Sequence, residues 1–177
     1  MSDNKLFHIS ENGSIEIFHP RPSLSKLKGI NGDVVFGISG RLLHNYLLPR
    51  DCPRVTYYAT SKTTQQDKEK FLQTPAAFVV AIETKWLKAI QQTTLYCYEF
   101  DNTTFVIADE CAGYYVSYEA IRPINIKRID NILDELLKRS NVEIRILSNL
   151  WPLAESVIKS TLNFSLIRMR NASAILS

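Results

Sequence analysis

The chain has 177 residues, 45% of them hydrophobic and 22% charged, and its formal net charge at pH 7 is +3. This length and composition fit one folded domain with a buried core, and they exclude a chain that is disordered throughout. The mild positive charge permits a phosphate-bearing ligand, but it gives no strong nucleic-acid signal, because the concentrated basic stripe typical of such proteins is missing.

Cysteine and histidine spacings exclude the common metal and disulfide frameworks. The three cysteines, Cys52, Cys97 and Cys111, form no CxxC pair and are odd in number. The three histidines match no ligand spacing such as HExxH, so no metal site is predicted. No apolar stretch approaches the roughly 18 residues of a spanning helix, and no signal region follows the start. These observations predict a cytoplasmic protein with reduced thiols and no membrane partner.

The first half of the chain predicts short strands and helices in alternation. Residues 6–10 alternate in polarity, which places Leu6 and His8 on one face of a strand. Residues 33–39 have no polar alternation, so we expect a strand buried on both faces. Between them, the prolines around Arg21 favour an extended exit, and residues 23–32 are predicted to form a loop. The further predicted elements are a helix over 41–48, a strand over 54–59, a helix over 67–72 and a strand over 76–82.

The second half predicts a hairpin followed by helices and an edge strand. In the hairpin, strands over 95–100 and 104–108 flank Asp101-Asn102. A helix over 85–91 precedes it, with Thr84 as its expected cap. The later elements are a strand over 114–121, an amphipathic helix over 129–139, a half-exposed edge strand over 142–147 and a last helix from 150. This order predicts an α+β fold, with a single domain over 1–177 and a mixed, mostly antiparallel sheet flanked by helices.

The stretch 41–59 concentrates arginines, tyrosines and prolines, and irregular backbone of this kind often carries function. Within it, Arg50, Asp51 and Arg54 bracket Cys52 and a proline. Arginine forks bind phosphate or carboxylate in a bidentate way. The favoured alternative is that Asp51 pairs with one of these arginines and pins the loop. The same cations are expected to lower the pKa of Cys52.

Other groups that could do chemistry are spread along the chain. His8 could orient a hydroxyl or contact a phosphate, and the equally weighted alternative is a core histidine held by a backbone carbonyl. Tyr46 is expected to pack rather than react, and Tyr118 could stack a planar ring or fill the rim of a core. The predicted catalytic residues are His8, Glu110 and Glu119, and the predicted ligand-binding residues are Ser10, Arg21, Tyr46, Arg50, Asp51, Arg54 and Tyr118.

Five segments together resemble a family of uncharacterised bacterial proteins. They are residues 6–10, 18–22, 45–54, 113–118 and 149–152, and they include the patterns LFHIS and NYLLPRDCPR. The resemblance therefore spans nearly the whole chain, but that family brings no established activity with it.

A more distant similarity is to the ADP-ribosyltransferase-like fold. That group often begins with a strand carrying His-x-Ser, as at His8, followed by a strand and a helix with a tyrosine, as over 34–46. A late strand that ends before a proline looks like residues 114–123. The resemblance implies that the histidine and the tyrosine hold NAD, and that a glutamate opening the late strand supports transfer. Here Tyr114 stands nearest that position, and the local acids are Glu110 and Glu119.

The sequence therefore predicts a pocket that binds a nucleotide or an ADP-ribose-like ligand, in a transferase-derived enzyme. NAD is the cofactor that the resemblance implies. His8 and the arginines around position 50 are expected to border one shared hollow. The alternative is a non-catalytic binding or interaction protein, joined as a homodimer through the edge strand over 142–147. A third hypothesis is a small-molecule hydrolase with Cys52 as its nucleophile.

Overall fold

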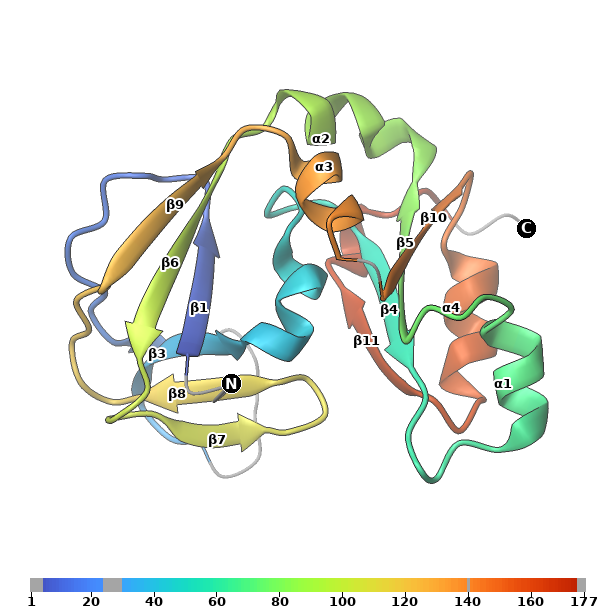
Figure 1. Ribbon diagram of the computed structural model, residues 1–177, viewed down its shortest axis with the longest axis horizontal. Coiled ribbons are helices and arrows are strands. Elements are labelled where there is room, and N and C mark those ends of the chain that lie inside the picture. Colours follow the sequence, from blue (N-terminus) through green and yellow to red (C-terminus); the bar gives the residue numbers. More distant parts are fainter. Residues whose placement is uncertain (1–4, 24–29, 140, 175–177) are drawn as a thin grey trace. The chain divides into compact units, whose positions relative to one another are not determined.

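The computed structural model describes residues 5–23, 30–139 and 141–174, so most of the loop predicted over 23–32 lies outside the described residues. The chain forms two compact units, unit 1 (Met1–Leu47 and Thr94–Asp130) and unit 2 (Leu48–Thr93 and Asn131–Ser177). Each unit has its own sheet (Figure 1). The predicted α+β class with mostly antiparallel pairing is confirmed, although the strands are divided between two sheets. That the chain is a single domain stays a prediction.

Unit 1 is built on a seven-stranded sheet whose pairings are antiparallel. The order along the sheet is β7-β8-β3-β1-β6-β9, and β2 pairs with β3. β3 has the predicted bounds, because its apolar run is bounded by a polar loop and Gly40. The strands are β1 (Lys5–Ser10), β2 (Arg21–Pro22), β3 (Asp33–Ser39), β6 (Leu95–Asp101), β7 (Val106–Asp109), β8 (Tyr114–Ser117) and β9 (Asn125–Ile129).

One face of this sheet carries an aromatic core. Leu6, Tyr98 and Phe100 are buried in it. Phe18 packs edge-on against both Tyr98 and Phe100, with ring centroids 5.0 Å apart in each pair. His8 shares this face with Leu6, as the alternation predicts, and its ring centroid lies 4.9 Å from that of Phe18. We call this the aromatic core face of unit 1.

The predicted hairpin around Asp101-Asn102 is wrong in its pairing. β6 pairs with β1 on one edge and with β9 on the other, so no edge remains for β7, which pairs with β8. Phe105 in the connecting turn stacks on Phe100 with ring centroids 5.6 Å apart, which anchors that turn to the core. The hairpin that forms, β7–β8, closes at Gly113. Its φ is +68° and a Cβ there would lie 2.6 Å from Ser39 Oγ, so only glycine fits.

The helix predicted over 41–48 is a 3-10 helix, η1 (Gly40–Tyr46). The prediction is therefore right in position and wrong in helix type. The 3-10 form has three residues per turn, so side chains three residues apart eclipse each other. Leu43 and Tyr46 consequently share a row, whereas the predicted α-helical spacing paired Leu43 with Leu47.

Unit 2 is built on a four-stranded sheet of order β10-β5-β4-β11. β10 runs parallel to β5, and the other two pairings are antiparallel. The predicted edge position of β10 is confirmed within this sheet. The elements are β4 (Arg54–Tyr58), α1 (Gln65–Phe71), β5 (Phe78–Glu83), η2 (Thr84–Trp86), α2 (Leu87–Gln92), α3 (Ile132–Leu137), β10 (Val142–Leu147), α4 (Trp151–Ile158), β11 (Asn163–Ile167) and η3 (Met169–Asn171).

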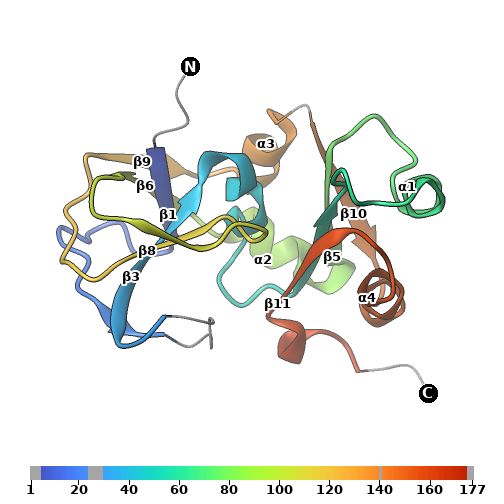
Figure 2. The ribbon, with the colours of Figure 1, turned by 90° about the horizontal axis from the view of Figure 1, so that it is seen from below.

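Helices α1 and α4 cover one face of the unit 2 sheet, as the two views of Figures 1 and 2 both show. Tyr57 and Val79 of the sheet are buried against Phe71 of α1. They also share a core cluster with Leu150, which directly precedes α4, and with Val157 of α4. Burying such apolar side chains contributes about 1.5 to 3 kcal/mol each, so this layer stabilises unit 2.

Two helix starts in unit 2 differ from the prediction. The helix expected from Ile129 begins at Ile132, because the Asn131 side chain caps it by accepting the backbone N–H three residues on at 3.1 Å. Ile129 instead ends β9 of unit 1. Thr84 is no cap, since it lies inside η2 and its hydroxyl donates to the carbonyl oxygen of Leu147 at 3.2 Å.

Candidate functional site

His8 is held by the backbone of the neighbouring strand. Its Nδ1 lies 3.1 Å from the carbonyl oxygen of Phe36, and because a carbonyl only accepts, Nδ1 carries the proton. The half-buried ring packs against Phe18 and lies 6.3 Å from the ring centroid of Phe100. This environment is that of the carbonyl-held histidine. A catalytic role for His8 stays a prediction.

Three half-buried aromatic rings lie together in unit 1: Phe36 of β3, Tyr46 at the end of η1, and Tyr114 opening β8. The Tyr46 hydroxyl donates a hydrogen bond to the Tyr114 hydroxyl, and the two ring centroids are 5.9 Å apart. Phe36 packs edge-on against Tyr114, also at 5.9 Å. We call these three residues the tyrosine face.

The tyrosine face and His8 lie on opposite sides of the unit 1 sheet. Val35 belongs to the aromatic core that His8 contacts. Side chains alternate along a strand, so the next residue, Phe36, points to the other side, where it meets Tyr114. The structure therefore does not bring His8 and Tyr46 together on one face, although the sequence analysis assigns both to one ligand.

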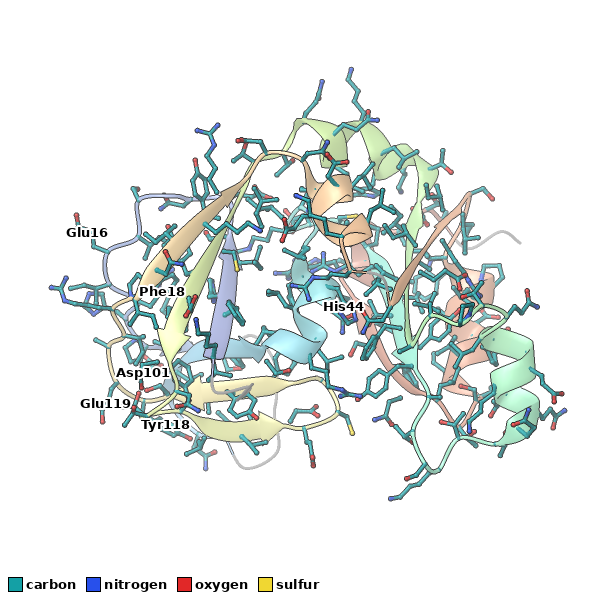
Figure 3. The ribbon with its side chains drawn as sticks, in the orientation of Figure 1. Glu16, Phe18, His44, Asp101, Tyr118 and Glu119 are labelled. Atoms are coloured by element: carbon teal, nitrogen blue, oxygen red, sulfur yellow. The ribbon has the colours of Figure 1, made fainter. Side chains whose placement is uncertain are left out.

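The remaining predicted residues of unit 1 are spread around its surface. Ser10 Oγ accepts the backbone N–H of Asn12 at 3.1 Å, which shapes the turn after β1. Tyr118 is 51% exposed. In the view of Figure 3, Tyr118, Glu119 and Asp101 all lie toward the same end of the unit. Arg21 and Glu110 are also exposed, Arg21 in β2 and Glu110 in the β7–β8 turn.

The arginine loop belongs to unit 2, where Arg54 is buried and fixes backbone. Its Nη1 donates to the carbonyl oxygens of Pro49 at 3.2 Å and Cys52 at 2.9 Å. Asp51 lies 3.9 Å from Arg168, and the Arg168 side chain also donates to the Arg50 carbonyl at 3.3 Å. The loop is thus pinned by Arg54 and by the C-terminal segment. The predicted hollow shared by His8 and these arginines would join the two units and stays a prediction.

Cys52 does not have the environment expected of a nucleophile. The side chain is 0% exposed. Burial raises the pKa of the Cys52 thiol from 9.0 to about 12, which outweighs the lowering effect of Arg54. Arg54 therefore lowers this pKa as predicted, but the net shift is upward, and the hydrolase hypothesis loses its nucleophile.

Thiol labelling checks this assignment. We expect iodoacetamide at about pH 8 to label the exposed Cys111 at an ordinary rate and to label Cys52 at least about a hundredfold more slowly, because the thiolate is the reactive form. Peptide mapping by mass spectrometry gives both rates, and labelling in denaturant shows that Cys52 is intrinsically competent. Equal rates in the native protein would contradict the buried, protonated thiol.

Sequence reasoning missed a buried carboxylate at the end of β5. Glu83 is 0% exposed and accepts the backbone N–H of Ser173 at 3.0 Å and that of Leu150 at 3.2 Å. Lys85 Nζ lies 3.2 Å from it. Burial alone would raise the pKa of Glu83, but these donors hold the pKa below its ordinary value. The only local signal for this site in the sequence is that an acidic residue, Glu83, ends an apolar strand. Glu83 ties the C-terminal segment and the start of α4 to the sheet.

Unit 1 also has a surface hollow of about 460 Å³, formed by residues 13–16 with Arg122, Pro123 and Ile126. Tyr98 fixes one wall, since its hydroxyl donates to the Asn12 carbonyl at 2.7 Å and accepts the Ile15 N–H at 3.1 Å. None of the residues predicted from sequence to form the site lines this hollow.

Two further observations on the described residues concern metal binding and membrane crossing. Among the described residues, no three His, Cys, Asp or Glu side chains gather closely enough to hold a metal ion. In the same part of the chain, no helix combines the length and the apolar character needed to cross a membrane.

Comparison with known proteins identifies the family. The model of DUF6886, a family of unknown function, matches residues 7–172, and the chain belongs to this family. No curated protein and no solved structure matches the chain. The resemblance to an uncharacterised family is thereby confirmed, and the resemblance to ADP-ribosyltransferases stays a prediction.

Proposed function

We propose that this chain binds a nucleotide or an ADP-ribose-like ligand, NAD among them, and that the tyrosine face of unit 1 stacks the planar base. The hydrogen bond between the Tyr46 and Tyr114 hydroxyls carries this proposal. It fixes two half-buried rings against each other, so little side-chain freedom remains to be lost when a ligand binds.

The chemistry of the face suits a planar ligand. Phe36 supports Tyr114 from the side, and aromatic side chains that are rigid and partly accessible stack nucleobases without needing a particular base. Arg41 is exposed and lies on η1, the same helix as Tyr46, where its guanidinium is suited to a phosphate.

The likeness to the ADP-ribosyltransferase-like fold supports the ligand class through Tyr46 alone, because His8 lies on the opposite side of the unit 1 sheet, and it supports transfer still less. The His-x-Ser pattern lies on β1, and Tyr46 ends the helix after β3, as that likeness implies. The late strand, β8, opens with Tyr114 where a glutamate would support transfer, and the Tyr114 hydroxyl is engaged with Tyr46. We therefore propose binding as the primary function, with Glu110 in the preceding turn as the nearest acid for any chemistry.

The test is calorimetric titration of the protein with ADP-ribose, NAD and AMP. We expect Tyr46→Ala to weaken binding about 5- to 150-fold, since a base stacked on an aromatic ring is worth about 1 to 3 kcal/mol. Tyr46→Phe keeps the stacking surface and should weaken binding less.

The matched control is Ile107→Ala, which removes an exposed apolar side chain of the same unit and should leave the affinity unchanged. Circular dichroism confirms that each variant folds. Absence of wild-type binding to all three ligands at millimolar concentration, or equal affinity in Tyr46→Ala, would reject the proposal.

The alternative of a homodimer joined through β10 has less support. On this edge strand Arg145 turns back into unit 2, where it donates to the Tyr57 hydroxyl and to the Phe71 carbonyl, both at 2.7 Å. Glu143 accepts from Arg145 on the same strand. Inward-pointing charges of this kind protect an edge strand from pairing with another chain.

A further inference from the structure

The outer edge of the unit 1 sheet at β9 combines several features of a peptide-docking site. β9 ends the strand order and pairs with β6, and within the described residues no strand pairs with its other edge. Its first four residues are exposed. An edge strand presents backbone N–H and C=O groups that can pair with an added strand.

Apolar side chains are exposed along this edge. Ile124 is 61% exposed and Ile126 is 45% exposed. Ile126 lies opposite Tyr98 in the β6–β9 register, so it belongs to the same side of the sheet as the aromatic core. It also lines the hollow of about 460 Å³, beside Ile15 and Pro123. The edge therefore adjoins a recess of mixed polarity, with these apolar side chains in its lining, that is large enough for side chains of a bound segment.

The charged residues of the edge are all positive. Residues 122–128 contain three cations, Arg122, Lys127 and Arg128, and no acidic residue. Arg128 is paired with Asp130 at 2.8 Å. Arg122 lines the hollow, and among the described residues it makes no ion pair and no side-chain hydrogen bond. Figure 3 shows the one acid of the hollow, Glu16, directed outward from its loop.

We propose that the β9 edge and this hollow dock an extended peptide segment of a partner protein that carries acidic side chains. The segment adds to the sheet as a strand, places an apolar side chain over Ile126 and brings a carboxylate to Arg122. Main-chain hydrogen bonds supply the affinity, as in other strand-addition complexes. The hollow and Arg122 supply the specificity for particular side chains.

Asn125 shows how the edge is closed in the free chain. Its Oδ1 accepts the backbone N–H of Ile126 at 2.9 Å, which is the contact that the carbonyl of an added strand makes. The side chain must be displaced when the peptide pairs. Asn125→Ala should therefore bind the peptide at least as tightly as the wild type.

Fluorescence anisotropy with the full chain tests the proposal. The probe is a fluorescein-labelled eight-residue peptide in which valine and glutamate occupy alternate positions of one strand face, so that both can reach the hollow, and threonine fills the positions between them. Two matched peptides serve as controls, one with lysine in place of glutamate and one with N-methylated valines, which keeps the side chains but blocks main-chain pairing. We expect binding of the first peptide and a loss of about tenfold or more with each control.

Arg122→Glu is expected to weaken binding of the acidic peptide about tenfold. Lys159→Glu, a charge reversal at an exposed cation of unit 2, should leave binding unchanged. Failure of the acidic peptide to bind at millimolar concentration, equal binding of the lysine or N-methylated peptide, or an equal effect of both charge reversals would overturn the proposal.

Discussion

Glu83→Ala is expected to lower the free energy of unfolding by about 3 to 5 kcal/mol, the typical cost of removing one partner from a buried charged group. The substitution leaves the N–H groups of Leu150 and Ser173 without their acceptor, and Leu150 is fully buried. Urea unfolding followed by circular dichroism measures the change. Glu155→Ala, at an exposed position on α4, is the matched control and should change the free energy by less than about 0.5 kcal/mol.

The contribution of Glu83 should also depend on pH in a defined direction. Its folded-state pKa lies below the ordinary value of 4.5, so the unfolded chain binds the proton more readily. The stabilisation is complete above that ordinary value and is lost as the pH falls through the folded-state pKa. The difference in unfolding free energy between wild type and Glu83→Gln should therefore shrink in acid. A difference that grows in acid would contradict the hydrogen-bonded carboxylate.

Phe100→Ala is expected to cost about 3 to 5 kcal/mol through the cavity it leaves in unit 1. The side chain is 0% exposed and packs against Phe18 and stacks on Phe105. Thermal and urea unfolding measure the loss. Phe164→Ala removes a ring that is 39% exposed and should cost much less. A small effect of Phe100→Ala would show that the aromatic core is not the main stabilising element of unit 1.

The same two variants test whether the chain is one cooperative domain, since Glu83 lies in unit 2 and Phe100 in unit 1. If the chain is a single domain, each variant shifts one common transition. Two separate transitions, each moved by only one of the substitutions, would mean that the units unfold independently.

Local patterns predicted the elements whose signals are contained in a few neighbouring residues. The uninterrupted apolar run of β3 and the alternation of β10 gave correct strands, and Pro152 near the start of α4 marked that helix. The pairing partner of each strand was harder to predict, because pairing joins residues that are distant in the sequence. Asp101-Asn102 has the composition of a hairpin turn, yet β6 has both edges filled by β1 and β9.

The elements that the sequence analysis did not predict show the same limit. β9 and β11 flank predicted helices, and their isoleucines and leucines fit a helical stripe as well as a strand. The last helix, predicted from residue 150, ends at Ile158, and the chain then enters β11 at Asn163. The choice is made by tertiary contact, since β11 pairs with β4 more than a hundred residues earlier.

The candidate site was partly predictable for the same reason. Composition singled out Tyr46, but its partner Tyr114 lies 68 residues away, and no spacing rule links them. Glu83 looked like an ordinary strand end, because its partners Leu150 and Ser173 follow 67 and 90 residues later. His8 was placed on the correct face, and only the structure shows that Tyr46 lies on the opposite one.

The most direct measurement is a titration with ADP-ribose followed by NMR of selectively labelled tyrosine rings, of which the chain has eight. We expect saturable shifts of the Tyr46 and Tyr114 resonances, with those of Tyr57 and Tyr58 in unit 2 unmoved. Shifts confined to other tyrosines, or no shift at millimolar ligand, would contradict it.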